Sequence, residues 1–224
     1  MLWMDRMRQL VLIALLAGCV VHAADSRIAA IADLPGGAAW HNSPAASKMD
    51  DGRLTIVAGP STDWYISPVD GKSTSNAPLL LFEPAEDFVL TARLQVAFGT
   101  QWDAGVLMVY VDDANWAKFA LEMSVYGEPT IVTVVTRGIS DDCNSSSIAG
   151  GSIWYRIAKT GRAIGFYASP DGHSWKMIRA FTLRASGRLR AGFGSQSPVG
   201  QKGTAVFSEI RYSARTIKDI FKGE

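Results

Sequence analysis

The sequence has few cysteines, few histidines and no excess of charge, and each shortage excludes a class of protein. Of its 224 residues, two are Cys, three are His, 22 are Lys or Arg and 21 are Asp or Glu. Cys19 lies at the N-terminal leader, where processing would either remove it or attach a lipid to its thiol, so Cys143 has no partner and an intramolecular disulfide is excluded. No Cys/His spacing resembles a zinc site. The balanced charge argues against nucleic acid or an anionic membrane as partner, because both require clustered positive charge.

Long hydrophobic runs are also scarce. The longest, LVLIALLAGCVV at residues 10–21, has about a dozen residues, whereas a membrane-spanning helix needs roughly 20. It follows the charged residues Asp5, Arg6 and Arg8 and precedes the small-residue segment VHAA at residues 21–24. This order is typical of a secretory signal peptide. We therefore expect an exported protein without a membrane span, either periplasmic, anchored in the cell envelope, or secreted.

The leader fits two processing enzymes. Cleavage after Ala23 would remove residues 1–23 and release the protein. The segment LAGC at residues 16–19 resembles the lipobox of bacterial lipoproteins; cleavage before Cys19 would remove residues 1–18 and leave a lipid anchor on that thiol. Both interpretations stay open. The complete lipobox favours the anchor, whereas the apolar residues that follow it favour release.

The rest of the chain alternates with a period of two residues, which predicts strands. The clearest case is FVLTARLQVAF, residues 88–98, and turn residues such as SPDGHS separate a dozen or so similar segments. Strands at this spacing without intervening helices predict an all-β, antiparallel β-sandwich or jelly roll over residues 50–214. We expect a tether with an edge strand near Trp40 in residues 24–49 and a short helix in residues 215–224. We expect a monomer.

Four segments carry a resemblance to a known family. They are STDWYISP at residues 61–68, WDAGVLMVYVDDANWAKFALEM at 102–123, VVTRGISDD at 134–142 and SPDGHSW at 169–175. Their order resembles a family of concanavalin A-like domains of unknown function whose eukaryotic namesake is called a regulator of enolase. The resemblance covers about residues 50–212. It implies a lectin/glucanase-type sandwich of two curved sheets, the concave side of which binds sugars in many relatives. This sequence departs from the family where Asp142 and Cys143 replace a usual aromatic residue.

The segment WAKFALEMSV, residues 116–125, has the composition of a sugar-binding strand. Every second residue from Ala117 is predicted to face the core, so Trp116, Lys118 and Glu122 share the other, open face. An aromatic ring can stack on a pyranose, and charged groups can bind its hydroxyls. The alternative is an exposed charge network around a partly buried tryptophan.

Residues of neighbouring strands are candidates for the same site. If the strand order of the family holds, five of them are expected to converge on the same sheet: Asp103, Arg137, Asp141, Asp142 and Arg156. A glycoside hydrolase would need two carboxyl groups, here Glu122 with Asp103 or Asp141. Because no strand carries the alternating acidic residues of the glucanase relatives, we favour a non-catalytic glycan-binding module over a hydrolase. A third alternative is a protein-interaction module that uses the same face or a sheet edge.

No cofactor is expected, although calcium is an alternative. Hard oxygen ligands for it would come from Asp112 and Asp113, or from Asp141, Asp142 and Asn144. Cys143 lies in the polar segment SDDCNSSS, which we interpret as a loop. The two neighbouring carboxylates would disfavour its thiolate, so a catalytic cysteine is not expected.

Overall fold

A computed structural model of the chain describes residues 34–183 and 187–224, which form an all-β structure. The leader, with both cleavage positions and Cys19, lies outside the described residues. Within the described part of the chain, no helix is long and apolar enough to cross a membrane.

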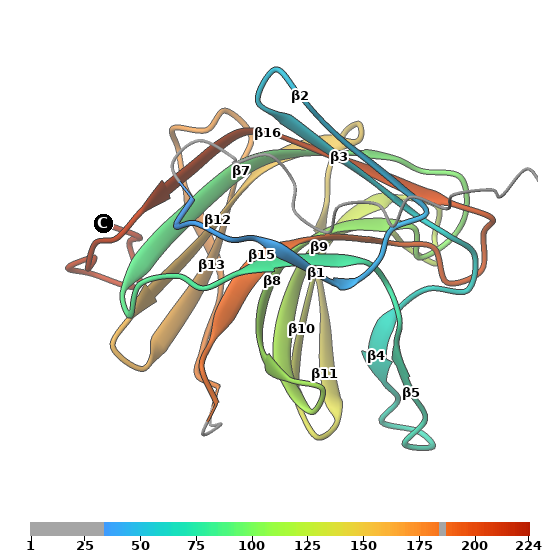
Figure 1. The fold of residues 1–224 in the computed structure, drawn as a ribbon, viewed down its shortest axis with the longest axis horizontal. Helices are drawn as coiled ribbons and strands as arrows, with labels where there is room; N and C mark the ends of the chain where they lie inside the picture. The colour runs from blue at the N-terminus through green and yellow to red at the C-terminus, as the bar shows by residue number, and fades with distance from the viewer. Residues whose placement is uncertain (1–33, 184–186) are drawn as a thin grey trace, which may run out of the picture.

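Two antiparallel sheets pack face to face, and sheet B arches over sheet A in Figure 1. Sheet A has the order β1 (Ala39–Asn42), β6 (Leu79–Phe82), β15 (Arg190–Gln196), β8 (Ala104–Asp112), β9 (Asn115–Met123), β10 (Pro129–Arg137) and β11 (Ser140–Ser147). Sheet B has the order β14 (Lys176–Phe181), β13 (Ala163–Ser169), β12 (Ser152–Thr160), β7 (Phe88–Ala97), β16 (Gly203–Ser213), β3 (Arg53–Ala58) and β2 (Ala46–Asp50). A separate hairpin joins β4 (Trp64–Ile66) to β5 (Ser73–Ser75). The predicted β-sandwich is confirmed.

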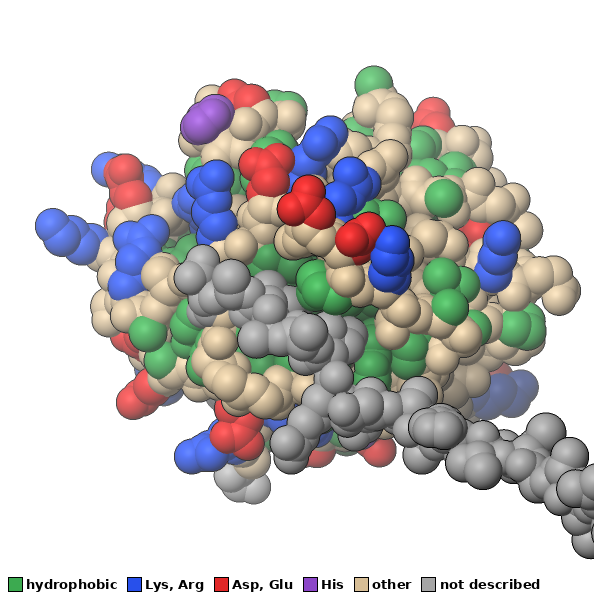
Figure 2. Space-filling model, turned by 45° about the horizontal axis from the view of Figure 1, so that its top comes forward, with side chains coloured by type: hydrophobic (Ala, Val, Ile, Leu, Met, Phe, Trp, Pro, Cys, Tyr) green, Lys and Arg blue, Asp and Glu red, His purple; other side chains and the backbone are tan. Residues whose placement is uncertain are grey.

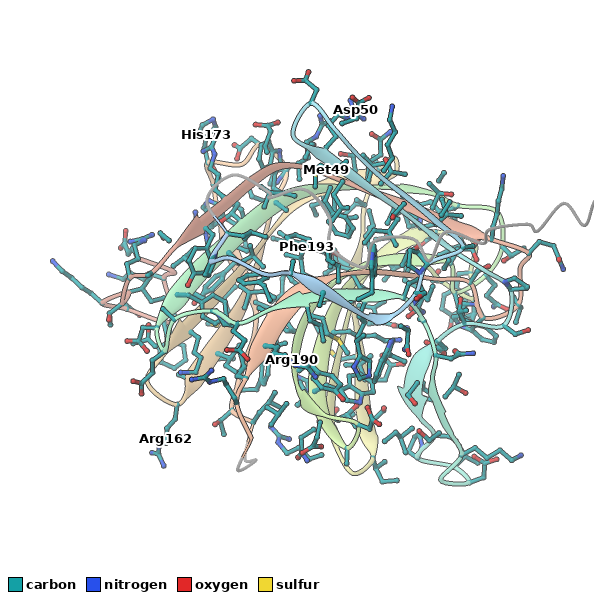
Figure 3. All side chains as sticks on the ribbon, viewed as in Figure 1. Met49, Asp50, Arg162, His173, Arg190 and Phe193 are labelled. Carbon is teal, nitrogen blue, oxygen red and sulfur yellow. The ribbon has the colours of Figure 1, made fainter. Side chains whose placement is uncertain are left out.

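The core lies between the sheets and is built from alternate residues of each strand. Phe193 of sheet A, labelled in Figure 3, packs edge-on against Phe207 of sheet B, with ring centres 5.1 Å apart. Phe119 of β9 stacks on Tyr155 at 3.7 Å. The Tyr155 hydroxyl donates a hydrogen bond to the carbonyl of Ala120 at 2.8 Å, which satisfies a polar group inside the core. Strand β9 is therefore fixed against sheet B through its inner face.

The polar segment SDDCNSSS is not a loop, as we expected, but the edge strand β11. Seven of its eight residues are exposed. An edge strand pairs on one side only, so polar side chains are tolerated there and also discourage pairing with another chain. Residues 46–49, expected in the segment of tether and edge strand, form with Asp50 the edge strand β2 of sheet B, and β1 around Trp40 lies at the edge of sheet A.

The predicted C-terminal helix is not formed. Residues 214–224 instead make turns and irregular backbone against the outer face of sheet B. Ile217 is buried there with Val89, Ala158 and Tyr167. So short a segment is a marginal helix by itself, and contacts with the sheet decide its conformation.

The hairpin β4–β5 covers part of the outer face of sheet A. Trp64 inserts between Trp116 and Tyr110 of the sheet, with ring centres 5.9 and 5.7 Å away. Its indole N–H donates to the carbonyl of Ala77 at 2.8 Å, and the Ile66 N–H donates to Ser140 Oγ at 2.9 Å. The hairpin is thereby held on sheet A by the packing and hydrogen bond of Trp64 and by the hydrogen bond of Ile66 to Ser140.

Candidate functional site

A pocket of about 340 Å³ lies on the outer face of sheet A, where the hairpin β4–β5 and the loops beside β8 and β15 meet the sheet. Its walls combine charged, amide and aromatic side chains. The lining residues are Asp63, Tyr65, Trp102, Lys118, Glu122, Asp142, Gln196 and Pro198.

Strand register brings the polar residues of the sheet together. Gln196 of β15 and Glu122 of β9 both pair with Ala104 of β8, which lies between them. Because paired residues point to the same face, the small side chain of Ala104 leaves room for the two longer ones to meet above it. In the same way, Lys118 of β9 and Asp142 of β11 share Val134 of β10 as a neighbour.

A chain of hydrogen bonds runs from Asp63 beside the hairpin to Lys118 of β9, and the buried amide of Gln196 continues it to Glu122 of the same strand. Lys118 Nζ donates to Asp63 Oδ1 at 3.1 Å and to Gln196 Oε1 at 3.0 Å. Gln196 Nε2 then donates to Glu122 Oε2 at 3.3 Å and to the carbonyl of Trp102 at 3.1 Å. Each polar group is held in a defined orientation, as a binding site requires.

Burial controls the charges of this pocket. It raises the pKa of Glu122 to about 8, with the neighbouring charge of Lys118 opposing and those of Asp142 and Asp63 reinforcing the shift. Asp142 belongs to the exposed strand β11, but it lines the pocket, and partial desolvation there raises the pKa of its carboxyl group. For Lys118, burial favours the neutral amine, but the attraction of Asp63 and Glu122 outweighs it and raises the pKa. At neutral pH the pocket therefore holds a Lys118 cation and a largely protonated Glu122 carboxyl group.

Two aromatic side chains form the walls above these groups. Tyr65 is half-buried and reaches the pocket from the hairpin. Trp102 is 38% exposed, and its backbone has a φ of +64°. A bulky residue rarely adopts this conformation, and such strain is often found at functional sites. The Trp102 N–H donates to the carbonyl of Met123 at 2.8 Å, which ties this loop to the end of β9.

Of the residues proposed from the sequence, Lys118 and Glu122 lie in the pocket. Both are buried, contrary to the alternative of an exposed charge network. Trp116 shares their face, as the alternation predicted, but the expectation that it is open is wrong: its exposed fraction is 0%. The hairpin covers it, so Trp116 supports Trp64 and does not line the pocket.

Asp103, Asp141 and Arg156 do not converge with Glu122 in this pocket. The Asp103 carboxylate is buried and accepts hydrogen bonds from the Gly99 and Thr100 N–H groups at 2.9 and 2.8 Å and from the hydroxyls of Thr100 and Ser197. Asp141 points away from the pocket and binds Arg179 at 2.9 Å. Arg156 lies on β12, which belongs to sheet B.

The sequence did not indicate Asp63, Tyr65, Trp102 or Gln196, whereas Asp142, expected beside Asp141 on the same sheet, does line the pocket. The segment STDWYISP contained a usable signal, because Asp63 and Tyr65 flank a tryptophan and must share a face opposite to it. Nothing in the local pattern around Gln196 indicates its role, which depends on β15 lying beside β8.

Among the described residues, no group of three or more His, Cys, Asp or Glu side chains could hold a metal ion. Asp112 accepts hydrogen bonds from the Ala114 N–H and from Asn115. Asp113 accepts one from the Tyr110 hydroxyl at 2.6 Å. This acidic pair thus stabilises its own turn.

Comparison with known proteins agrees with this architecture. Residues 40–215 match the family described as "Protein of unknown function (DUF1349)". The chain belongs to this family. It is 25% identical over 178 residues to "Regulation of enolase protein 1" of Saccharomyces cerevisiae, which covers 78% of this chain and 88% of that protein. The predicted resemblance to the family of unknown function whose eukaryotic namesake is a regulator of enolase is confirmed.

Solved structures share the fold of this DUF1349 chain. A functionally unknown protein from S. cerevisiae superposes with a TM-score of 0.75 and 23% identity, covering 80% of this chain and 97% of that one. The GH43 protein BlXynB (mutant K247S) from Bacillus licheniformis gives a TM-score of 0.64 and 17% identity over 82% of this chain, but only 38% of its own length. At such identities the likeness establishes the β-sandwich, which also occurs as a part of larger carbohydrate-active proteins.

Proposed function

We propose that this chain is a non-catalytic carbohydrate-binding module that acts outside the cytoplasm, with the pocket on sheet A as its binding site. The supporting observation is the hydrogen-bonded series Asp63, Lys118, Gln196 and Glu122 beside the aromatic walls of Tyr65 and Trp102. A pocket of about 340 Å³ lies within the range of about 300 to 1,000 Å³ typical for small ligands.

The chemistry of these groups matches that of a sugar. Hydroxyl groups both donate and accept hydrogen bonds, and the pocket offers the Lys118 ammonium as a donor and the Asp63 carboxylate as an acceptor. The protonated carboxyl group of Glu122 can both donate and accept a hydrogen bond. The exposed indole of Trp102 offers an apolar surface for the C–H groups of a pyranose ring.

The neighbours in fold add support of a coarser kind. One is described as xylan beta-1,4-xylosidase from Bacillus halodurans, with a TM-score of 0.57 and 14% identity over 33% of its length. The activity in this description is that of the complete enzyme, of which the matched part is only 33%. For this chain it suggests that xylo-oligosaccharides should be among the first sugars tested.

Calorimetric titration of residues 34–224 with a panel of mono- and oligosaccharides tests the proposal. We expect one sugar class to bind and Trp102→Ala to abolish the binding, because the variant removes an aromatic wall without opening the core. Tyr126→Ala is the matched control, since Tyr126 is 82% exposed and does not line the pocket. Absence of binding to every sugar, or equal loss in both variants, would rule the proposal out.

A glycoside hydrolase is a second candidate, and the raised pKa of Glu122 favours it. A carboxyl group protonated at neutral pH can act as a general acid. Its partner would have to be Asp142 or Asp63 of the same pocket; Asp103 is enclosed by its loop and Asp141 is bound to Arg179.

Release of reducing ends from any oligosaccharide that binds separates the two candidates. The hydrolase predicts turnover that Glu122→Gln removes while binding persists. The binding module predicts no turnover in either protein.

Export rests on the leader alone. The intact mass of the mature protein from its host distinguishes a chain beginning at Ala24 from one beginning at a lipidated Cys19. A mature chain that retains residues 1–18 would contradict both.

A further inference from the structure

A second pocket, of about 360 Å³, lies on the opposite side of the molecule, on the outer face of sheet B. It is bordered by β12, by β16 and by the turn that follows β13. Figure 3 labels His173 in this turn. Figure 2 shows that basic and acidic side chains gather over this side of the molecule. Arg156, Arg211 and Arg215 all line the pocket, together with Trp154 and Trp175.

Arg156 lies in this pocket without a countercharge. Its guanidinium carbon is 3.9 Å from the centre of the Trp175 ring, so stacking fixes the plane of the group. Nη1 donates to the carbonyl of Gly223 at 3.3 Å, but Nε is buried and has no hydrogen-bond partner. None of the ion pairs formed in the described part of the chain includes Arg156.

The two carboxylates that border the pocket are already engaged. Asp171 accepts hydrogen bonds from the His173 and Ser174 N–H groups at 2.8 and 2.7 Å and from Ser169 Oγ at 2.8 Å. Glu209 lies 4.0 Å from Arg211. Burial, and next the like charge of Arg215, lower the pKa of Arg156. The lining carries three guanidinium groups against two carboxylates, and neither carboxylate forms an ion pair with Arg156.

Nη2 of Arg156 is not buried and donates no hydrogen bond within the described part of the chain, so a ligand can reach the outer edge of the guanidinium, whose parallel N–H groups match the two oxygens of a carboxylate. We propose that this pocket is a second binding site, in which Arg156 receives the carboxylate of an acidic sugar such as a uronic acid. A bare carboxylate would not fill about 360 Å³, whereas a pyranose ring fits beside Trp154. The proposal does not depend on the pocket of sheet A.

Titration with glucuronate tests the proposal, with the indole N–H signals of Trp154 and Trp175 followed by NMR. We expect both signals to shift. Arg156→Gln and Arg156→Lys should each weaken the affinity at least about tenfold, because neither keeps the planar charged fork. Arg93→Gln is the matched control: Arg93 is an exposed arginine of the same sheet that does not line the pocket, so its variant should bind as the unmodified protein does.

Titrations with other ligands and with a variant of the sheet A pocket identify the chemistry of the ligand and the pocket that binds it. Glucose should cause no shift, acetate a weaker response than glucuronate, and Trp102→Ala should leave glucuronate binding intact, which separates this site from the one on sheet A. Lack of response to glucuronate, an equal response to acetate, a stronger response to inorganic phosphate, or unchanged affinity in both Arg156 variants would each overturn the proposal. If Arg156→Gln lowers the melting temperature relative to Arg93→Gln, the comparison rests on Arg156→Lys.

Discussion

Lys118 is the residue on which the pocket of sheet A is organised. Its side chain is 4% exposed, yet its ammonium group is bound by Asp63 on one side and by Gln196 on the other. A buried charge is tolerated only when it is paired and fully hydrogen-bonded. The lysine therefore requires both the hairpin β4–β5 and the end of β15 to be in place.

Glu122 should make stability depend on pH. Its pKa is about 8 in the folded protein against an ordinary value of 4.5, so between these values the unfolded chain loses a proton that the folded protein keeps. The free energy of unfolding then falls as pH rises, by at most about 1.4 kcal/mol per pH unit from this group.

Urea unfolding of the unmodified protein and of Glu122→Gln measures this effect. The glutamine cannot ionise, so the free energy of unfolding of the variant should rise relative to that of the unmodified protein as the pH increases from about 5 to about 8. Two curves that stay parallel over this range would show that Glu122 has an ordinary pKa.

Asp103 and Asp141 appear equivalent in the sequence, but their environments differ. Asp103 is fully buried and accepts hydrogen bonds from two backbone N–H groups and two hydroxyls, whereas the side chain of Asp141 is 64% exposed beside Arg179. Asp103→Asn turns an amide donor toward these donors and should lower the free energy of unfolding by about 3 kcal/mol. Asp141→Asn should lower it by less than about 1 kcal/mol. Chemical denaturation gives both values; similar losses would mean that the Asp103 loop is not held by its carboxylate.

At the scale of elements, the hairpin β4–β5 is the part of the site that belongs to neither large sheet. It is held by Trp64 against Tyr110 and Trp116, and it carries Asp63 and Tyr65. Trp64→Ala should lower the free energy of unfolding by about 3 to 5 kcal/mol and weaken sugar binding, because the hairpin loses its anchor.

Val69→Ala is the control for this variant. Val69 lies in the turn of the same hairpin and is 93% exposed, so its loss should change stability by no more than about 0.5 kcal/mol. Thermal unfolding measures both. If Trp64→Ala unfolded like the control, the hairpin would not depend on the tryptophan.

The same elements explain what the sequence could and could not predict. Alternation located β7 and β9 and the faces of Lys118 and Glu122, because successive side chains of a strand point to opposite faces whatever its partners. It could not show that Trp116 is covered, since the cover comes from a hairpin about fifty residues earlier. Nor could it identify β11 as a strand, because an edge strand has no apolar face, or separate Arg156 from the other site residues, because that depends on which sheet β12 joins.

At the scale of the molecule, the two pockets lie on opposite outer faces of the sandwich, with the core between them. Their linings share no residue. Close-packed sheets are rigid, and effects at well-separated positions usually add within about 0.5 kcal/mol. Saturation with glucuronate should therefore change the affinity of the pocket on sheet A for its sugar by less than about threefold, as measured by calorimetry.

Because coupling between two ligands is reciprocal, the converse titration must give the same factor. A factor of ten or more in either direction would mean that binding at one face repacks the core, and the strands β7 and β9, which contact each other across it, would be the first place to look.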